Sequence, residues 1–191
     1  LEGHNSSQAV KLLNPGGVDV LRNSTYLPIA GAMGVLNRGR TSGKSSFADI
    51  AYLGDGIYAC LDATRSKLFC YDADGELLFA FGGLGSQKGD VAGALAVDSR
   101  GADLLVLDGV AGDVAVLRPT VYGETVLRAV RSYRQGKYDT VLADYKTILR
   151  LDANSEIAYA GIGRVLLRSG RYKDAMQYFQ LANNYTYYSK A

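Results

Sequence analysis

The amino-acid sequence predicts an α+β protein in which antiparallel β-sheet repeats are followed by α-helical hairpins. Residues 1–119 hold 18 of the 23 Gly and all three Pro, whereas residues 120–191 hold 10 of the 14 Tyr and no Pro. Gly and Pro punctuation is typical of short strands joined by turns, and its scarcity favours helices. Each part also contains its own internal repeat, with an offset of 46 residues in the first and 34 in the second.

The expected domain boundary lies at Pro119, where composition and charge both change. Residues 1–119 carry a net charge of −3 and residues 120–191 a net charge of +5. Residues 1–8 are rich in Ser, Asn and Gly, and we expect a flexible terminus or an expression remnant there. Residues 9–119 are expected to form about two β-sheet repeats and part of another, and residues 120–191 to form helices.

The sheet repeat begins at Phe47, and its two copies align Asp62 with Asp108. Each copy is expected to contain an apolar strand, a Gly or Asp turn, a second strand that ends on the Asp, a polar loop and a third strand. The run Asp-Ala-Asp-Gly at 72–75 then predicts a hairpin turn into a fourth strand, because such turns need positive φ. A period in the forties with several short strands is typical of β-propeller blades. We interpret Asp62 and Asp108 as acceptors for backbone N–H groups of the following loops.

Residues 9–46 are less regular. Residues 10–13 and 18–21 are expected to be strands of an earlier blade, joined by a turn at Asn14-Pro-Gly-Gly, and residues 31–46 an exposed flexible loop. The run Gly39-Arg-Thr-Ser-Gly-Lys-Ser has three residues between its glycines where a phosphate-binding loop has four. We therefore expect no nucleotide there.

Cys60 and Cys70 are predicted on neighbouring strands of one hairpin, with Cys60 opposite Leu68. In that register the two cysteines are diagonal neighbours, too far apart for easy disulfide formation. We interpret them as buried apolar residues; a disulfide would require a register in which they face each other directly.

The helical part divides into two 34-residue units, 122–155 and 156–189. Gly136 corresponds to Gly170 and Tyr138 to Tyr172, and apolar residues recur at three and four positions within each unit. Both glycines are expected to end a helix in the left-handed conformation. Each unit is therefore predicted to be a helical hairpin.

Composition excludes several kinds of site. His4 is the single His in the sequence, so a His-based triad or His-rich metal site cannot be built from this chain. We expect no catalytic, cofactor-binding or metal-binding residue, and no nucleic-acid partner, because a charge of +5 over the last 72 residues is modest and no reading motif accompanies it. The chain has no run of 18 apolar residues, so we expect no membrane insertion by this segment.

Three stretches carry a family resemblance: SSFADIAYLGDGIYACLDATRSKLFCYDADGELLFAFGGLGSQKGD, LLVLDGVAGDVAVLRPTVYG and AYAGIGRVLLRSGRYKDAMQYFQLANNYTYYSKA. Together they resemble bacterial NHL-repeat β-propeller proteins with tetratricopeptide (TPR) hairpins, as found in Gram-positive extracytoplasmic proteins. The resemblance implies an incomplete propeller followed by TPR-like repeats. It also implies that the chain is a fragment of a longer protein, which is membrane-anchored and lies outside the cytoplasm or at the cell surface.

The resemblance also implies a non-catalytic module that binds a protein or peptide on the surface lined by the first helix of each hairpin. The residues expected on that surface are Tyr133, Arg134, Arg164, Leu167 and Arg168. The arginines can pair with an acidic partner, because guanidinium groups bind carboxylates bidentately; the alternative is a basic surface that is merely solvated. A second functional alternative is a fragment of a gluconolactonase-like metal-dependent propeller hydrolase, for which Asp49, Asp62 and Asp108 are the candidate ligands.

Overall fold

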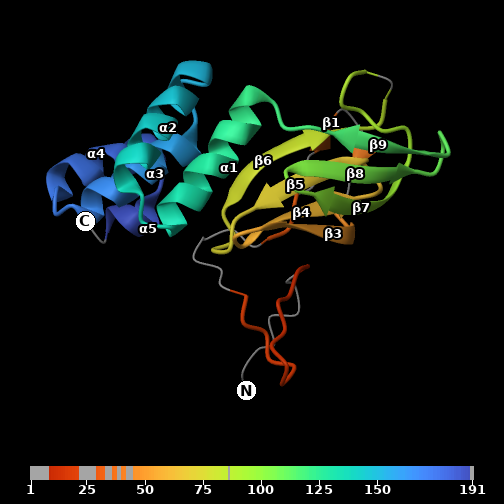
Figure 1. Cartoon of the computed structure of the whole chain (residues 1–191), viewed down its shortest axis with the longest axis horizontal. Helices are drawn as coiled ribbons and strands as arrows, with labels where there is room; N and C mark the ends of the chain where they lie inside the picture. The colour runs from red at the N-terminus through yellow and green to blue at the C-terminus, as the bar shows by residue number, and fades with distance from the viewer. Residues whose placement is uncertain are drawn as a thin grey trace. The chain divides into compact units, whose positions relative to one another are not determined.

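The computed structural model describes residues 9–21, 29–32, 36–37, 40–41, 45–85 and 87–189. The chain divides into two compact units, Leu1–Arg118 and Pro119–Ala191, which we call the sheet unit and the helical unit. Antiparallel sheets make up the first and α-helices the second (Figure 1). The predicted α+β class, with sheets preceding helices, is confirmed. The expected flexible terminus at 1–8 lies outside the described residues.

The first sheet is an antiparallel meander of four strands in the order β3-β4-β5-β6. The tight β3–β4 turn has positive φ at Asp55 and Gly56, as a two-residue hairpin of this twist requires. At the β5–β6 turn the Asp72 carboxylate accepts hydrogen bonds from the N–H groups of Asp74 and Glu76. Residues within the turns themselves therefore determine where the strands end. The strands are β3 (Phe47–Gly54), β4 (Ile57–Asp62), β5 (Lys67–Tyr71) and β6 (Leu77–Gly82).

The second sheet repeats the first three strands, in the order β7-β8-β9. Its strands are β7 (Ala94–Arg100), β8 (Asp103–Asp108) and β9 (Asp113–Leu117). The strands predicted in both copies of the repeat are confirmed. Among the described residues no fourth strand pairs with β9, because the chain continues through Pro119 into a helix.

The first sheet is buried on both faces. On one face Tyr58, Cys60, Phe69 and Tyr71 form a core cluster with Val10 and Ile29 from the N-terminal segment. On the other face lie four side chains paired across β4 and β5, and each is at most 1% exposed. These four are Ala59, Leu61, Leu68 and Cys70.

The second sheet packs on the face that carries Leu61. Asp49 lies directly opposite Leu61 in the β3–β4 pairing, so both side chains stand on the same face. The Asp49 carboxylate accepts a hydrogen bond of 2.9 Å from the Val97 N–H group in β7. β7 contacts both β3 and β4, so two successive copies of the repeat stack against each other.

The expected register of the two cysteines is wrong by one residue. Cys60 lies opposite Phe69, and Cys70 opposite Ala59, because the β4–β5 loop spans only 63–66 and Asp62 pairs with Lys67. The two thiols therefore stand on opposite faces of the sheet, and both are free and buried, as predicted. Burial raises the pKa of each thiol to about 12, which keeps both protonated at neutral pH.

The N-terminal part of the sheet unit is less regular than predicted. Residues 10–13 and 18–21 meet in a single bridge, Leu13 to Asp19, rather than in two regular strands. Half of the predicted loop 31–46, and most of the run Gly39–Ser45, lie outside the described residues. The described part contains two short paired strands, β1 (Leu36–Asn37) and β2 (Arg40–Thr41).

The helical unit consists of two antiparallel hairpins and a short final helix. The first helix of each hairpin ends at a glycine with φ near +74°, Gly136 or Gly170. After the first of these helices the Lys137 N–H group bonds to the Ser132 carbonyl, and after the second the Arg171 N–H group bonds to that of Leu166. Both ends are Schellman motifs, as the predicted left-handed glycines require. The helices are α1 (Val121–Arg134), α2 (Tyr138–Leu151), α3 (Glu156–Arg168), α4 (Tyr172–Leu181) and α5 (Tyr185–Tyr188).

Two glycines within α3 let aromatic rings approach its backbone. A Cβ atom added at Gly161 would overlap the ring of Tyr145 in α2, and one added at Gly163 would lie 2.6 Å from Phe179 Cε1 in α4. Tyr145 and Phe179 are at most 1% exposed. Small residues on α3 therefore allow it to pack between α2 and α4, as the contacts between consecutive helices show. None of the helices in the described part of the chain has the length and apolar character needed to cross a lipid bilayer.

Candidate protein-interaction site

Four residues from three helices form a compact arginine–tyrosine cluster in the helical unit. Tyr133 lies in the last turn of α1, Tyr138 begins α2, and Arg164 and Arg168 lie one turn apart in α3. The rings of Tyr133 and Tyr138 make an edge contact with centroids 5.7 Å apart. The Schellman turn between α1 and α2 places these two rings together, because it reverses the chain within three residues.

Arg168 is the exposed cation of this cluster. Its Nε atom donates a 3.0 Å hydrogen bond to the Tyr133 hydroxyl, and its guanidinium carbon lies 5.6 Å from the Tyr133 ring centroid and 5.9 Å from that of Tyr138. The hydrogen bond to Tyr133 raises the pKa of Arg168 above its ordinary value. Two aromatic rings thus hold an exposed guanidinium group in one orientation.

Arg164 does not lie on the exposed surface, contrary to the sequence-based expectation. The residue is only 7% exposed, and its guanidinium lies 5.5 Å from the Tyr133 ring centroid and 5.7 Å from that of Tyr187. Tyr187 in turn stacks on Phe179, at 5.5 Å between centroids. The guanidinium group of Arg164 is therefore buried against tyrosines from α1 and α5. It packs against the Tyr133 ring inside the unit and does not face solvent.

The other two predicted surface residues are sequence neighbours of cluster residues. Arg134 is exposed in the last turn of α1, and Leu167 is half-buried beside Arg168 in α3. Sequence reasoning missed Tyr138 and Tyr187. The available signal was the pair Tyr133 and Tyr138 on either side of Gly136, together with arginines spaced i, i+4 on one helix face.

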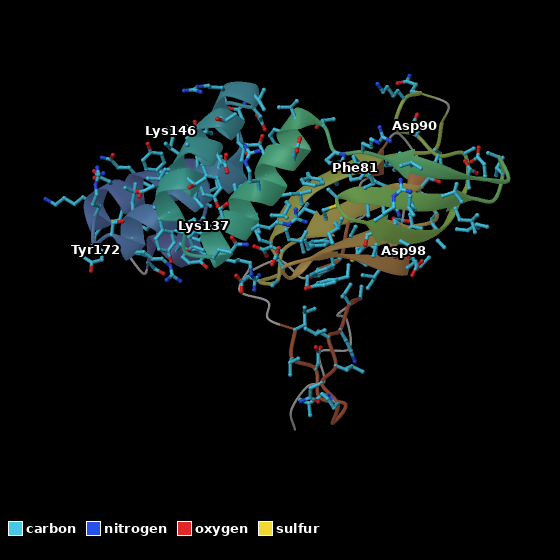
Figure 2. The ribbon with its side chains drawn as sticks, viewed as in Figure 1. Phe81, Asp90, Asp98, Lys137, Lys146 and Tyr172 are labelled. Carbon is cyan, nitrogen blue, oxygen red and sulfur yellow. The ribbon has the colours of Figure 1, made fainter. Side chains whose placement is uncertain are left out.

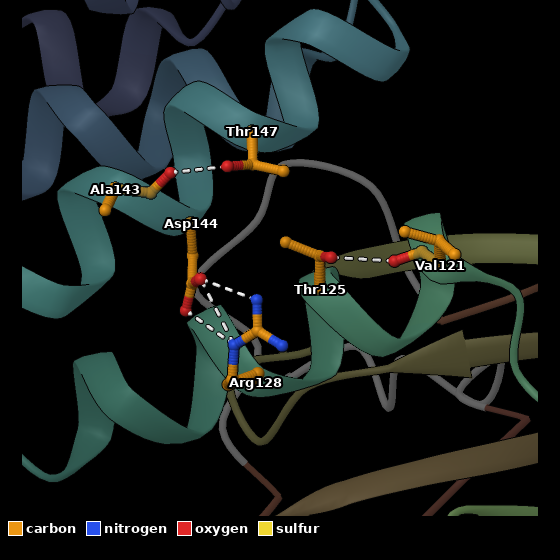
Figure 3. A network of polar contacts seen from close by, with 6 residues as sticks. All are labelled: Val121, Thr125, Arg128, Ala143, Asp144 and Thr147. Carbon is orange, nitrogen blue, oxygen red and sulfur yellow. Dashed lines mark hydrogen bonds and ion pairs between the residues drawn. The ribbon is translucent and has the colours of Figure 1, made fainter.

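Arg128 belongs to a different, structural contact within the same unit. Its guanidinium forms a forked ion pair with the buried Asp144 of α2, with Nη2 to Oδ1 at 2.8 Å and Nε to Oδ1 at 3.1 Å (Figure 3). The hydrogen bond to Asp144 raises the pKa of Arg128. The Thr125 and Thr147 hydroxyls bond to the carbonyls one turn earlier in their own helices. This pair ties α1 to α2, and the Asp144 carboxylate offsets the charge of Arg128, whose side chain is still 52% exposed.

The three aspartates considered as metal ligands in the sheet unit all accept hydrogen bonds from protein groups. Asp62 accepts from the Arg65 side chain at 2.6 Å, and Asp49 bridges the Ile50 and Val97 N–H groups. Asp108 accepts from four backbone N–H groups, confirming its predicted role in the loop. In the part of the chain that the structure describes, no cluster of three His, Cys, Asp or Glu side chains can hold a metal ion.

The Asp108 loop predicts a pH-dependent contribution to stability. The hydrogen bond from the Ala111 N–H group, with those from Val110, Ala92 and Gly93, lowers the pKa of Asp108 below its ordinary value. A carboxyl group with a lowered folded-state pKa stabilises the protein above its unfolded-state pKa, and this contribution disappears as the pH falls through the folded-state pKa. Replacing Asp108 with Asn should therefore lower the melting temperature by several degrees at neutral pH, with a smaller difference in acid.

The measurement is the melting temperature of the wild-type protein and the variant as the pH is lowered from neutrality. Asp113→Asn is the matched control, because Asp113 is exposed at the start of β9. A difference between Asp108→Asn and wild type that stays constant over the whole pH range would contradict the assignment.

Comparison with protein-family models and with curated proteins finds no match to this chain.

Proposed function

We propose that the chain is a non-catalytic protein-interaction module, in which the helical unit binds an acidic peptide or protein segment and the sheet unit is a rigid platform. In this proposal the sheets are propeller-type blades and the helical hairpins are TPR-like repeats, as in bacterial NHL/TPR proteins with an extracytoplasmic location. The 46-residue offset between the sheets and the 34-residue offset between the hairpins support it.

The observation that carries the proposal is the fixed, exposed guanidinium of Arg168. A free arginine side chain loses rotamer entropy when it binds a partner, but Arg168 is already held by Tyr133 and Tyr138. Guanidinium has five N–H donors, so donors remain after Nε bonds to the Tyr133 hydroxyl. An ordered cation with spare donors suits carboxylate recognition.

The proposal predicts that Arg168→Glu weakens binding of an acidic peptide about tenfold, the loss expected for one charged hydrogen-bonded contact. The probe is a fluorescein-labelled peptide of alternating Glu and Leu with an amidated C-terminus, and the readout is fluorescence anisotropy. The same peptide with Lys in place of Glu should bind the wild type more weakly than the acidic peptide.

Lys146→Glu is the control with an equal change in charge. Lys146, labelled in Figure 2, is exposed on α2 and lies eight residues along that helix from Tyr138. Equal losses of affinity in the two variants would show that the effect comes from net charge alone and not from the cluster. Equal affinity for the acidic and basic peptides would contradict the proposed partner. Arg164→Glu is unsuitable for this test, because a buried carboxylate between two tyrosine rings should destabilise the unit.

A further inference from the structure

The two sheets present equivalent faces in very different environments. The 46-residue offset that aligns Asp62 with Asp108 also places Leu105 at the position of Ala59 and Leu107 at that of Leu61. It likewise places Val114 at Leu68 and Val116 at Cys70. The β8–β9 pairing puts Leu105 opposite Val116 and Leu107 opposite Val114, so these four side chains stand on one face. We call them the outer face of the second sheet.

The equivalent face of the first sheet is fully covered. Leu61 and Leu68 are at most 1% exposed there, whereas Leu107 is 43% exposed, Val114 54% and Val116 45%. Ala96 lies opposite Leu107 as Asp49 lies opposite Leu61, and Leu95, in the bulge beside Ala96, is 58% exposed. A contiguous set of exposed branched aliphatic residues on a soluble surface marks an interaction site.

The structure also shows what covers this kind of face. The second sheet packs on the first through its opposite side, where Val97, Leu104 and Val106 are at most 5% exposed. Each sheet of the repeat therefore has one side that covers its predecessor and one side that its successor covers. The outer face of the second sheet is the successor-facing side.

We propose that the outer face of the second sheet binds a further antiparallel sheet of the same repeat, through residues equivalent to Val97, Leu104 and Val106 of that sheet. A second copy of this chain is a poorer occupant. Its covering faces, within the described residues, are already occupied: that of the second sheet by the first sheet, and that of the first sheet by Val10 and Ile29. This inference is independent of peptide binding by the helical unit.

The test adds one repeat to the full chain. A copy of residues 73–118 is inserted after Arg118, which supplies a fourth strand to the second sheet and a third sheet beyond it. The joint keeps the repeat spacing, because Asp72 and Arg118 are themselves 46 residues apart. A shorter insertion of residues 73–82 supplies the fourth strand alone and serves as the control for strand addition.

The reporter is Leu107→Asn, measured as a shift in melting temperature. We expect the substitution to lower the melting temperature of the 191-residue chain and of the short insertion only slightly, since Leu107 is 43% exposed there. In the chain with the added sheet it should lower the melting temperature about as much as Leu61→Asn lowers that of the parent chain, because both then place a polar amide in a covered sheet face.

Two results would overturn the proposal. In the first, Leu107→Asn lowers the melting temperature of the chain with the added sheet no more than it lowers that of the 191-residue chain. This result counts against the proposal whether or not hydrogen exchange shows the added sheet to be folded. The other is a dimer of the 191-residue chain in sedimentation that Leu107→Asn dissociates, which would assign the face to a second copy.

Discussion

Replacing Tyr145 with alanine should lower the free energy of unfolding of the helical unit by about 3–5 kcal/mol, the range for loss of a large aromatic side chain from a packed core. The ring lies directly on the α3 backbone at Gly161 and is only 1% exposed. Its removal leaves a cavity that α3 cannot fill, because no side chain at Gly161 is available to move into it. The measurement is denaturant unfolding followed by far-UV circular dichroism.

Two further variants identify the cause of the expected loss. Tyr145→Phe keeps the ring and should retain most of the stability. Tyr172→Ala removes a ring that is 56% exposed at the periphery of the helical unit (Figure 2), and its effect should stay within about 0.5 kcal/mol. Similar losses for Tyr145→Ala and Tyr172→Ala would show that ring packing on Gly161 is not what holds α2 against α3.

The second large effect is expected in the sheet unit, at Leu61. Leu61→Ala should destabilise the unit by about 2–5 kcal/mol, because the side chain is fully buried between the stacked sheets. Leu107→Ala, at the equivalent position of the next repeat, should cost well under half as much, since its side chain is 43% exposed. Thermal unfolding of the two variants measures this difference directly, and equal losses would mean that Leu107 is covered in solution.

Local turn chemistry explains why so much of the sheet unit could be predicted. Asp72 in the turn after β5 and Asp108 at the end of β8 each have a carboxylate that accepts hydrogen bonds from nearby backbone N–H groups. Such contacts join residues only two to four positions apart, so they can be predicted from a short stretch of sequence. The register of Cys60 against Phe69 depended on one residue of loop length, and there the prediction failed.

The interaction site was harder to predict, because it depends on contacts between helices. The spacing of Arg164 and Arg168 correctly indicated one face of one helix. It could not show that Tyr133 and Tyr187 enclose Arg164 while Arg168 stays exposed. The exposure of Leu107 could not be predicted either, because apolar residues alternate in the same way in a covered sheet and in an uncovered one.

Within the described part of the chain, one edge of β9 has no paired strand, and this has a consequence for the solution behaviour of the protein. An open strand edge with exposed valines, here Val114 and Val116, invites uncontrolled growth of intermolecular sheets. In this chain Asp113 begins the strand, Arg118 follows it with an ion pair to Asp103, and Pro119 removes the next backbone donor. Charge and proline at the ends of an edge strand are known guards against aggregation. We therefore expect preparations of the protein to tolerate high concentration better at low ionic strength than at high, where these charges are screened.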